Sequence, residues 1–325
     1  MIKSIIIRVA ILLVGIIIVV LGRDFFYYSG SYSPPPTEIP DYEKIDVPMP
    51  PSTEFSDTYE QAEGTVLIDS AHYNSFDIEE LNVLTLRLIS RGLTIDFFKT
   101  GDVLEKELLG EEVEEEKEEA EEEEAEQEVV EEEKEGSNQE EEALEEEKEL
   151  PDVFIVVCPQ REFSKKERET VDEFVNNGGK LLLIADPTRR SRMNSLSLDF
   201  GLIFEPDYLY NIKEYDANYR NIFVSEFEEN EITNNLEKIA LYTTGSISSD
   251  NCSIAFSDEN TFSSLVETRE KLSPIALANE SKVLAIHDLT FMIEPHNGIL
   301  DNNQLIANIA DWLARPAEEE VEANK

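Results

Sequence analysis

A continuous apolar run lies near the start of the chain, from Ile5 to Leu21, and Arg8 is the one charged residue within it. Its seventeen residues, if helical at ~1.5 Å each, extend over roughly 26 Å, near the lower limit for crossing the hydrocarbon of a bilayer. The stems of Lys3 and Arg8 are long enough to carry their charges toward the headgroups. The pattern predicts an uncleaved transmembrane anchor over residues 1–24.

The residues on either side of this run help to decide between an anchor and a signal peptide, and they predict the orientation of the helix in the membrane. The positively charged start also fits a secretory signal, but the run is longer than a usual signal core and no small-x-small cleavage motif follows it. A cleaved signal and a buried core helix stay as alternatives. Lys3 and Arg8 lie at the start of the run, whereas Arg23 stands beside Asp24 after its end. The positive-inside rule then predicts a single-pass protein that contacts the membrane through residues 5–21 and holds its soluble domain outside the cytoplasm.

Proline recurs through residues 25–64, among Ser, Thr, Asp and Glu. Proline fixes φ and favours extended backbone, so the stretch predicts a semi-stiff stalk between membrane and domain. The aromatic cluster Phe25–Tyr28 at its start is typical of a membrane interface.

From residue 65 onward, short apolar runs alternate with helical spacing. The runs predict strands at 65–70, 94–99, 153–158 and 180–186. Apolar residues at helical spacing predict helices at 77–91 and 165–177. Gly92 ends the first helix, and Ser164 with Glu167 forms a capping box for the second. This order implies right-handed crossovers and an α/β fold, with a mostly parallel sheet and helices on both faces.

The later part of the chain is less regular. Short runs separated by turn residues predict strands at 221–227, 239–244, 253–256 and 275–279. We expect them to form a mixed extension of the sheet or a small β-layer. A buried strand at 283–289 and an amphipathic helix at 302–313, stopped by Pro316, close the domain. The sequence thus predicts one domain over residues 65–316, followed by an acidic tail at 317–325.

Charge is strongly one-sided. The chain of 325 residues carries 72 Asp or Glu and 27 Lys or Arg, a net charge of −45. This balance excludes nucleic-acid binding through a basic face. Residues 105–149 alone hold 26 Glu and 4 Lys, a net −22. Blocks of Glu repel, so residues 105–150 are expected to be a disordered insertion within the domain, or alternatively a segment that collects cations or basic partners.

Polar side chains follow the predicted parallel strands, where α/β sheets bind ligands. The candidate ligand-binding residues are His72, Asn74, Asp186, Arg189, His287 and Asp288. No His-x-x-x-His spacing supports a metal, and the aspartates could instead cap turns. The cationic stretch 189–192 could hold an anionic ligand or a partner's carboxylates, or pair with nearby Glu residues.

Reactive and cofactor motifs are missing from the sequence. It has no Gly-x-Ser-x-Gly, Gly-x-Gly-x-x-Gly or Walker pattern, so we expect no cofactor. Cys158 and Cys252 are too few for a disulfide framework or a Cys-rich zinc site. Cys158 precedes Pro159 and lacks the glycines of a nucleophile elbow. It is therefore predicted to be a buried strand residue.

Several stretches resemble a known family. VLIDSAHYNSFDIEELNVLTLRLISRGLTIDFF, DVFIVVCPQREFSKKERETVDEFVNNGGKLLLIADPTR, FGLIFEPDYLYN and the closing IHDLTFM…DNNQLIANIADWLA resemble the membrane-anchored domain-of-unknown-function family numbered 4350. That family is similar to class I glutamine amidotransferases, to the soluble domains of gliding-motility-type ABC transporter auxiliary proteins and to an intraflagellar transport subunit. The resemblance covers residues 65–315 without the acidic insertion, and it implies a flavodoxin-like sheet.

The resemblance also implies that catalysis is lost. Active amidotransferases carry a Cys after the strand that follows the Gly-Gly pair, and here Asp186 or a neighbour occupies that position. The catalytic His and Glu would lie near His287 and Asp288, where the match is partial. We therefore expect no catalytic residue and no metal. The expected function is a non-catalytic binding or scaffolding domain with a protein partner in a membrane complex, such as a transporter or envelope assembly. The alternative is a hydrolase that uses His72, Asp186, His287 and Asp288, with or without a metal.

Overall fold

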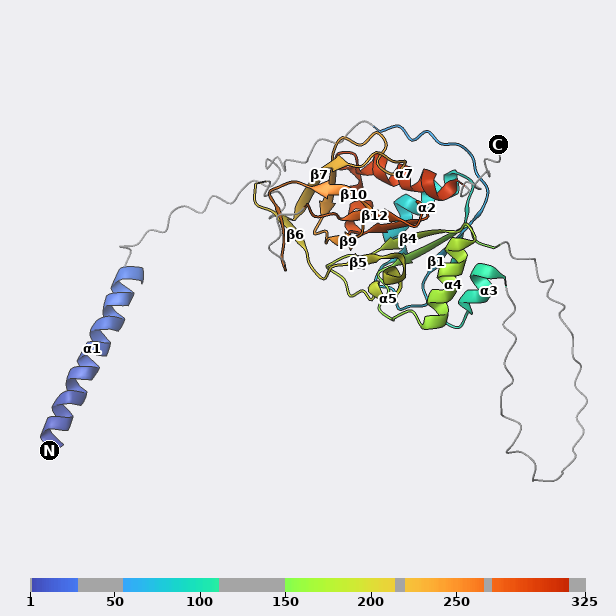
Figure 1. Ribbon diagram of the computed structural model, residues 1–325. Coiled ribbons are helices and arrows are strands. Elements are labelled where there is room, and N and C mark those ends of the chain that lie inside the picture. The colour runs from blue at the N-terminus through green and yellow to red at the C-terminus, as the bar shows by residue number, and fades with distance from the viewer. Residues whose placement is uncertain (1, 29–54, 111–149, 214–219, 266–270, 316–325) are drawn as a thin grey trace, which may run out of the picture. The chain divides into compact units, whose positions relative to one another are not determined.

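A computed structural model of the chain describes residues 2–28, 55–110, 150–213, 220–265 and 271–315 (Figure 1). The chain divides into two compact units, residues 1–49 and 50–325. The first is described through its helix and the second through a mixed α/β domain. The greater part of the glutamate-rich stretch, 111–149, and the tail after residue 315 lie outside the described residues.

The first unit is represented by the helix α1, Ile2–Tyr28. Residues Ile5–Phe26 are long and apolar enough to cross a membrane, with a mean hydropathy of 3.1 over the most apolar window. The helix runs past the predicted boundary at residue 24 and includes Phe25 and Phe26, which the proline pattern assigns to the stalk. Aromatic residues do not break a helix, so the helical hydrogen bonds continue to Tyr28.

The core of the second unit is a nine-stranded sheet in the order β2-β1-β3-β4-β13-β12-β10-β7-β8. Its parallel part consists of β1 Thr65–Asp69, β2 Thr94–Phe98, β3 Val153–Val157, β4 Lys180–Ile184 and β13 Val283–Ile286. The order β2-β1-β3-β4 is flavodoxin-like, and the change of direction lies between β1 and β3. The predicted fold class, a mostly parallel sheet with helices, is confirmed.

Helices cover both faces of this sheet (Figure 1). On one face lie α2 (Asn82–Ser90) and α7 (Asn302–Ala314), and on the other α3 (Leu104–Leu109), α4 (Lys165–Asn176) and the short α5 (Asn194–Ser197). Successive strand residues point to opposite faces. In β3, Ile155 belongs to the core beneath α2 and α7, whereas Phe154 belongs to the core beneath α3 and α4. Burial on both faces explains why β3 and β4 are continuous apolar runs.

The later strands extend the sheet and also add two small β-layers, so both of the predicted arrangements occur. The extension is antiparallel and consists of β12 Ile275–Ala278, β10 Ser253–Ser257, β7 Asn221–Phe227 and β8 Ile239–Tyr242. Two-stranded sheets pair β5 Leu202–Phe204 with β9 Ile247–Ser249, and β6 Leu209–Asn211 with β11 Thr261–Ser263. The remaining elements are the 3₁₀ turns η2 Ile78–Leu81, η3 Leu198–Phe200, η4 Thr290–Met292 and η5 His296–Gly298.

The structure corrects two predicted boundaries. The insertion was expected to begin at residue 105, but Leu104–Leu109 form α3, whose Leu104 and Leu108 are buried against α4. The helix predicted over 77–91 starts with the 3₁₀ turn η2, because the Glu80 carboxylate accepts the N–H of Asp77 and tightens the first turn.

The stalk was predicted to reach residue 64, but residues Phe55–Gly64 lie against the folded domain. We call this segment the strap. Asp57 pairs with Arg91 at 2.9 Å and also with Arg87, and the ring of Tyr59 stacks on the Arg91 guanidinium. Arg91 is fully buried and takes a second carboxylate from α7. The strap therefore supplies half of the counter-charge of a buried guanidinium.

Candidate functional site

The crevice at the direction change between β1 and β3, where open α/β sheets bind ligands, is filled by the protein's own side chains. Asp69 ends β1, and its carboxylate accepts the Asn74 amide at 2.9 Å and pairs with His72 Nδ1 at 2.9 Å. The Asn74 amide also donates to the carbonyl of Val157 in β3, at 2.9 Å. These bonds tie the end of β1 to the end of β3. The predicted residues His72 and Asn74 thus lie together, in a closed position.

The ring of His72 is fully buried and contacts both aromatic and acidic side chains. It stacks on Phe163 with centroids 3.8 Å apart, and its Nε2 lies 3.4 Å from a Glu167 oxygen. Burial would raise the pKa of Glu167, but hydrogen bonds from Ser164 and the charge of His72 keep it below its usual value. His72 therefore anchors the start of α4 and is not accessible to a ligand.

Cys158 follows β3 on a tight bend with a φ of 42°, in the left-handed region. Such a backbone is typical of strained positions at functional sites. The thiol is nevertheless fully buried, and burial together with the negative charge of Asp186 raises its pKa to about 12. Because the thiolate is the nucleophile, this cysteine is held in its unreactive form. Its burial agrees with the prediction from the sequence, but its place in the strand does not, because β3 ends at Val157 and the left-handed backbone of Cys158 leaves the sheet.

Asp186 follows β4, at the position where the resemblance would place a catalytic cysteine. Its carboxylate is buried and accepts the N–H and the hydroxyl of Thr188, at 2.8 and 2.5 Å. It also accepts the N–H of Leu289 at 3.2 Å and the hydroxyl of Thr290 at 3.3 Å. Four donors occupy this carboxylate, which therefore joins the ends of β4 and β13.

Asp288 is the second residue after the end of β13, beside the same junction. Burial, and then repulsion from Asp186, raise the pKa of Asp288 to about 8. Its two oxygens accept the N–H groups of Thr290 and Tyr242, each at 2.7 Å. Asp288 is therefore a buried carboxyl that can retain its proton near neutral pH, which is a recurring feature of general acids.

Arg189 leaves the β4 loop and reaches back to η2. Its guanidinium binds both oxygens of Glu80, at 2.7 and 2.5 Å, and donates to the carbonyl of Ser75 at 2.9 Å. The hydrogen bond to Glu80 raises the pKa of Arg189, and the same bond lowers the pKa of Glu80. Arg189 is thus a paired cation that fixes the loop after β4.

His287 is nearly fully buried at the end of β13. Its Nδ1 lies 3.0 Å from the carbonyl oxygen of Ser246, so Nδ1 must carry the proton and donate. Burial lowers the pKa of His287, and the ring stays neutral, with Nε2 as the lone-pair nitrogen. Phe204 packs edge-on against the ring at 5.1 Å, and Gly245 leaves no room for a Cβ beside it.

An open cavity of about 610 Å³ lies at the ends of β4 and β13, and we call it the carboxyl-end cavity. Of the six predicted residues, Asp186, Arg189 and His287 line it. The structure therefore brings half of the predicted cluster to one cavity. His72 and Asn74 lie in the closed crevice between β1 and β3, and Asp288 is buried behind the cavity wall.

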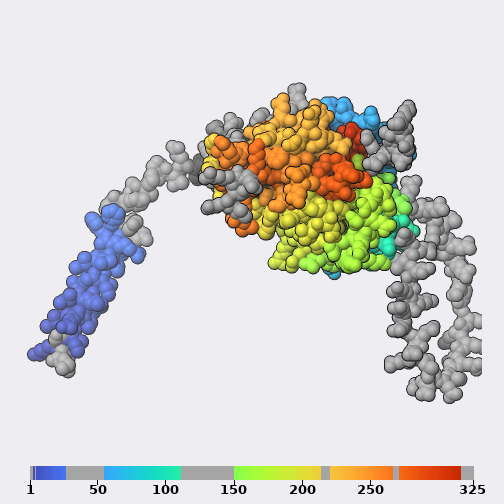
Figure 2. All heavy atoms as spheres, in the orientation of Figure 1, coloured from blue at the N-terminus to red at the C-terminus, as the bar shows by residue number. Residues whose placement is uncertain are grey.

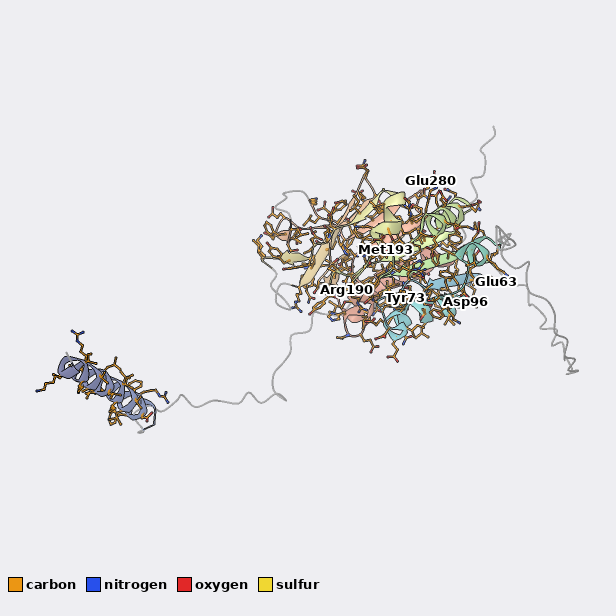
Figure 3. All side chains as sticks on the ribbon, turned by 90° about the horizontal axis from the view of Figure 1, so that it is seen from below. Glu63, Tyr73, Asp96, Arg190, Met193 and Glu280 are labelled. Atoms are coloured by element: carbon orange, nitrogen blue, oxygen red, sulfur yellow. The ribbon has the colours of Figure 1, made fainter. Side chains whose placement is uncertain are left out.

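The remaining lining includes residues that the sequence did not single out, notably Asn194 and Tyr208. The side chain of Asn194 pairs with both the N–H and the C=O of Phe204, at 2.8 and 2.9 Å. Tyr208 is 53% exposed and stands beside the cavity. An exposed aromatic residue between two short strands is the one local signal that could have indicated this position. Arg190, labelled in Figure 3, belongs to the loop after β4, and it is exposed without lining the cavity.

Across the described parts of the chain, no group of three or more His, Cys, Asp or Glu is arranged to hold a metal ion. The hydrogen bonds explain this for the predicted residues, because Asp186 and Asp288 are occupied by N–H and hydroxyl donors. A carboxylate that serves as an acceptor for backbone donors has few lone pairs left for a cation.

Comparison with known proteins places the domain at the level of the fold. No protein-family profile matches the chain, and no curated protein matches it. An mmIFT52 N-terminal domain is similar in structure, with a TM-score of 0.53 and 15% identity over 76% of this chain and 100% of that one. A protein described as ThuA-like from Parabacteroides merdae ATCC 43184 gives a TM-score of 0.43, with 10% identity over 80% of this chain and 93% of that one. The first likeness supports the shared α/β fold, and the resemblance to the family numbered 4350 stays a prediction.

Proposed function

We propose that the chain is a membrane-anchored, non-catalytic domain of amidotransferase-like type that binds a partner or ligand at the carboxyl-end cavity. In this proposal it belongs with the family numbered 4350 and serves as a scaffolding component of a membrane assembly, such as a transporter or envelope assembly. Residues 5–21 cross the bilayer. The domain lies outside the cytoplasm, because Lys3 and Arg8 lie at the start of the helix and Asp24 near its end.

The observation that carries the proposal is an open cavity whose reactive groups are already engaged. Asp186 holds four donors, Arg189 is bound by Glu80, and His287 is neutral and fixed on Ser246. The thiol of Cys158, at the end of β3, has its pKa raised to about 12. A cavity with a rigid, satisfied wall is suited to recognition, because its side chains need no rearrangement when a partner binds.

Photocrosslinking from the cavity tests this function. We would replace Tyr208 with a photoreactive phenylalanine derivative in the full chain and irradiate the membranes of cells that produce it. The matched control places the same residue at Leu86, which is 64% exposed on α2. A discrete crosslinked partner from position 208, absent from position 86, is the expected result. Equal products at both positions, or none at position 208, would contradict a binding role for the cavity.

One observation favours the alternative, a hydrolase. Burial raises the pKa of Asp288 to about 8, so this carboxyl can retain a proton at neutral pH, and the neighbouring His287 is neutral with Nε2 unprotonated. Against it, Asp288 lies behind the cavity wall and both its oxygens accept N–H groups. The test is turnover of nitrophenyl esters and anilides by the purified full chain. Hydrolysis that disappears in His287→Ala and persists in His72→Ala would establish an enzyme and replace the binding proposal.

A further inference from the structure

A second cavity, of about 780 Å³, adjoins the carboxyl-end cavity and is lined by serines. Figure 2 shows that yellow and orange segments of the chain adjoin on one face of the domain. We call it the serine groove. It is built from segments that lie far apart in the sequence, including β5, β9, β11 and the residues before β12. The two cavities share Leu198, Glu205 and Asp207 in their linings, so they are continuous along the surface.

The rim of the serine groove is apolar and exposed. Leu198, Ile203 and Leu265 line it with 53%, 40% and 61% of their surface exposed to solvent. Tyr208, on the adjoining cavity, is 53% exposed. Single exposed apolar residues are common on soluble domains, but a group of them around one groove is typical of an interaction site.

The inside of the serine groove is hydroxyl-lined and acidic. Asp207 is 4% exposed, and its oxygens accept the N–H of Ser246 and the hydroxyls of Ser246 and Ser263, at 2.6 to 2.9 Å. Glu205 accepts the Ser248 hydroxyl at 2.7 Å. Neutral donors thus hold these carboxylates in place without cancelling their charge.

Cations do not neutralise these carboxylates within the described parts of the chain. Asp207, Glu205 and the exposed Asp250 have no ion pair there. Lys271, the one cation in the lining, is paired with Glu226 outside the groove. The groove therefore combines an apolar rim with unneutralised negative charge, which favours a cationic occupant.

We infer that the serine groove binds a short segment of a partner protein in which Lys or Arg alternates with apolar residues. The stems of Lys and Arg cover apolar surface, so they would lie over Leu198, Ile203 and Leu265. Their charged ends would reach Glu205 and Asp250 at the groove and the serine oxygens inside it. This inference rests on the proposed binding function and names the chemistry of the partner.

The test uses the full chain in detergent and a fluorescein-labelled peptide of alternating Lys and Leu, with alternating Glu and Leu as the control peptide. Fluorescence anisotropy should show binding of the basic peptide alone, weakening as salt rises. The double variant Glu205→Gln/Asp250→Asn should weaken the affinity for the basic peptide by about fivefold. Leu265→Ser should also weaken this affinity by about fivefold. The matched controls, Glu280→Gln and Leu86→Ser, should stay within about twofold, since neither residue lines the groove.

Several outcomes would overturn the inference. Unchanged peptide affinity in all groove variants would contradict it. If deletion of residues 111–149 abolished binding while the groove variants bound normally, the glutamate-rich stretch would be the site that holds the peptide. A dimer of the free protein that is lost in Leu265→Ser would place a second copy in the groove instead. If the peptide did not bind but the crosslink from position 208 still formed, this inference would be wrong and the proposed function would remain supported.

Discussion

The side-chain amide of Asn302 hydrogen-bonds to both the N–H and the C=O of Ala240, at 3.0 and 2.7 Å. Ala240 belongs to β8, the last strand of the nine-stranded sheet, and Asn302 begins α7. The amide thereby takes the place of a neighbouring strand. Asp288 accepts the N–H of Tyr242, two residues further along β8. Side chains thus occupy the edge of β8, and another strand cannot pair there without displacing them.

Replacing Asn302 should destabilise the domain. Asn302→Ala leaves the buried N–H and C=O of Ala240 without partners, at a cost of about 2 kcal/mol in the free energy of unfolding. Asn302→Asp should cost more, because a carboxylate would face the carbonyls of Ala240 and His296. Urea unfolding measures both. Asn303→Asp is the control, because the Asn303 oxygen accepts from Arg87 and a carboxylate there keeps that role, so the stability should change little.

The strap should contribute to stability through Asp57. Asp57→Asn removes one of the two carboxylates around the buried Arg91 and should lower the free energy of unfolding by about 1–3 kcal/mol, since Asp57 itself is 21% exposed. Glu60→Gln, also in the strap, should have no measurable effect. Thermal unfolding of the two variants decides the matter, and equal midpoints would show that the strap is only a passive linker.

Stability should depend on the protonation of Asp288. Its pKa rises from about 4 in the unfolded chain to about 8 in the folded one. The folded state therefore binds more protons between these values, and this contribution to stability is lost as pH rises toward about 8. Asp288→Asn should remove that slope while lowering stability at pH 5, because one acceptor is lost. Wild type and variant are compared by urea unfolding at several pH values between pH 5 and 8; identical slopes would refute the assignment.

Glu80 should show the opposite dependence. The hydrogen bond from Arg189 lowers the pKa of Glu80, so its stabilising contribution is present at neutral pH and lost as pH falls below about 4.5. Glu80→Gln should therefore be less stable than the wild type at pH 7, and the gap should narrow at pH 3. Unfolding midpoints at the two pH values measure it, with Glu79→Gln, on the same turn, as the reference.

The ring of His287 should be sensitive to Gly245. A Cβ at Gly245 would lie closer to the imidazole than real side chains allow. Gly245→Ala should therefore displace the ring from Ser246, cost about 1–3 kcal/mol, and alter the histidine signals in NMR spectra. Gly298→Ala has open space around it and is the matched control. An unperturbed His287 signal in Gly245→Ala would mean that the backbone at Gly245 shifts to accommodate the Cβ and that the cavity wall is not rigid.

The elements that could be predicted from the sequence are those with local signals. The apolar runs of β3 and β4 indicate burial on both faces, and the Ser164–Glu167 capping box places the start of α4 at the observed residue. Because such signals depend on a few neighbouring residues, they survive without knowledge of the fold. The parallel order of the sheet then follows from the alternation of strands and helices.

The parts that could not be predicted depend on contacts between distant residues. The strap is held by Asp57 and Arg91, which are 34 positions apart, and its composition alone resembles a linker. Leu104 and Leu108 form a helix because α4 covers them, although glutamates surround them in the sequence.

The candidate site shows the same division. The rule that ligands bind at strand ends singles out Asp186, Arg189 and His287, which do line one cavity. The rule could not reveal that His72 would turn into the protein and stack on Phe163. Nor could it reveal that Asp288 would serve two backbone N–H groups. Side-chain direction after a strand depends on the loop that follows, and no local pattern encodes it.

Because the strap belongs to the folded domain, the position of a protease cut would decide the fate of the released fragment. Cleavage before Phe55 would shed a domain that keeps both counter-ions of Arg91. Cleavage beyond Gly64 would shed one with a buried guanidinium short of a carboxylate. Cuts on either side of these ten residues would therefore leave fragments of different stability.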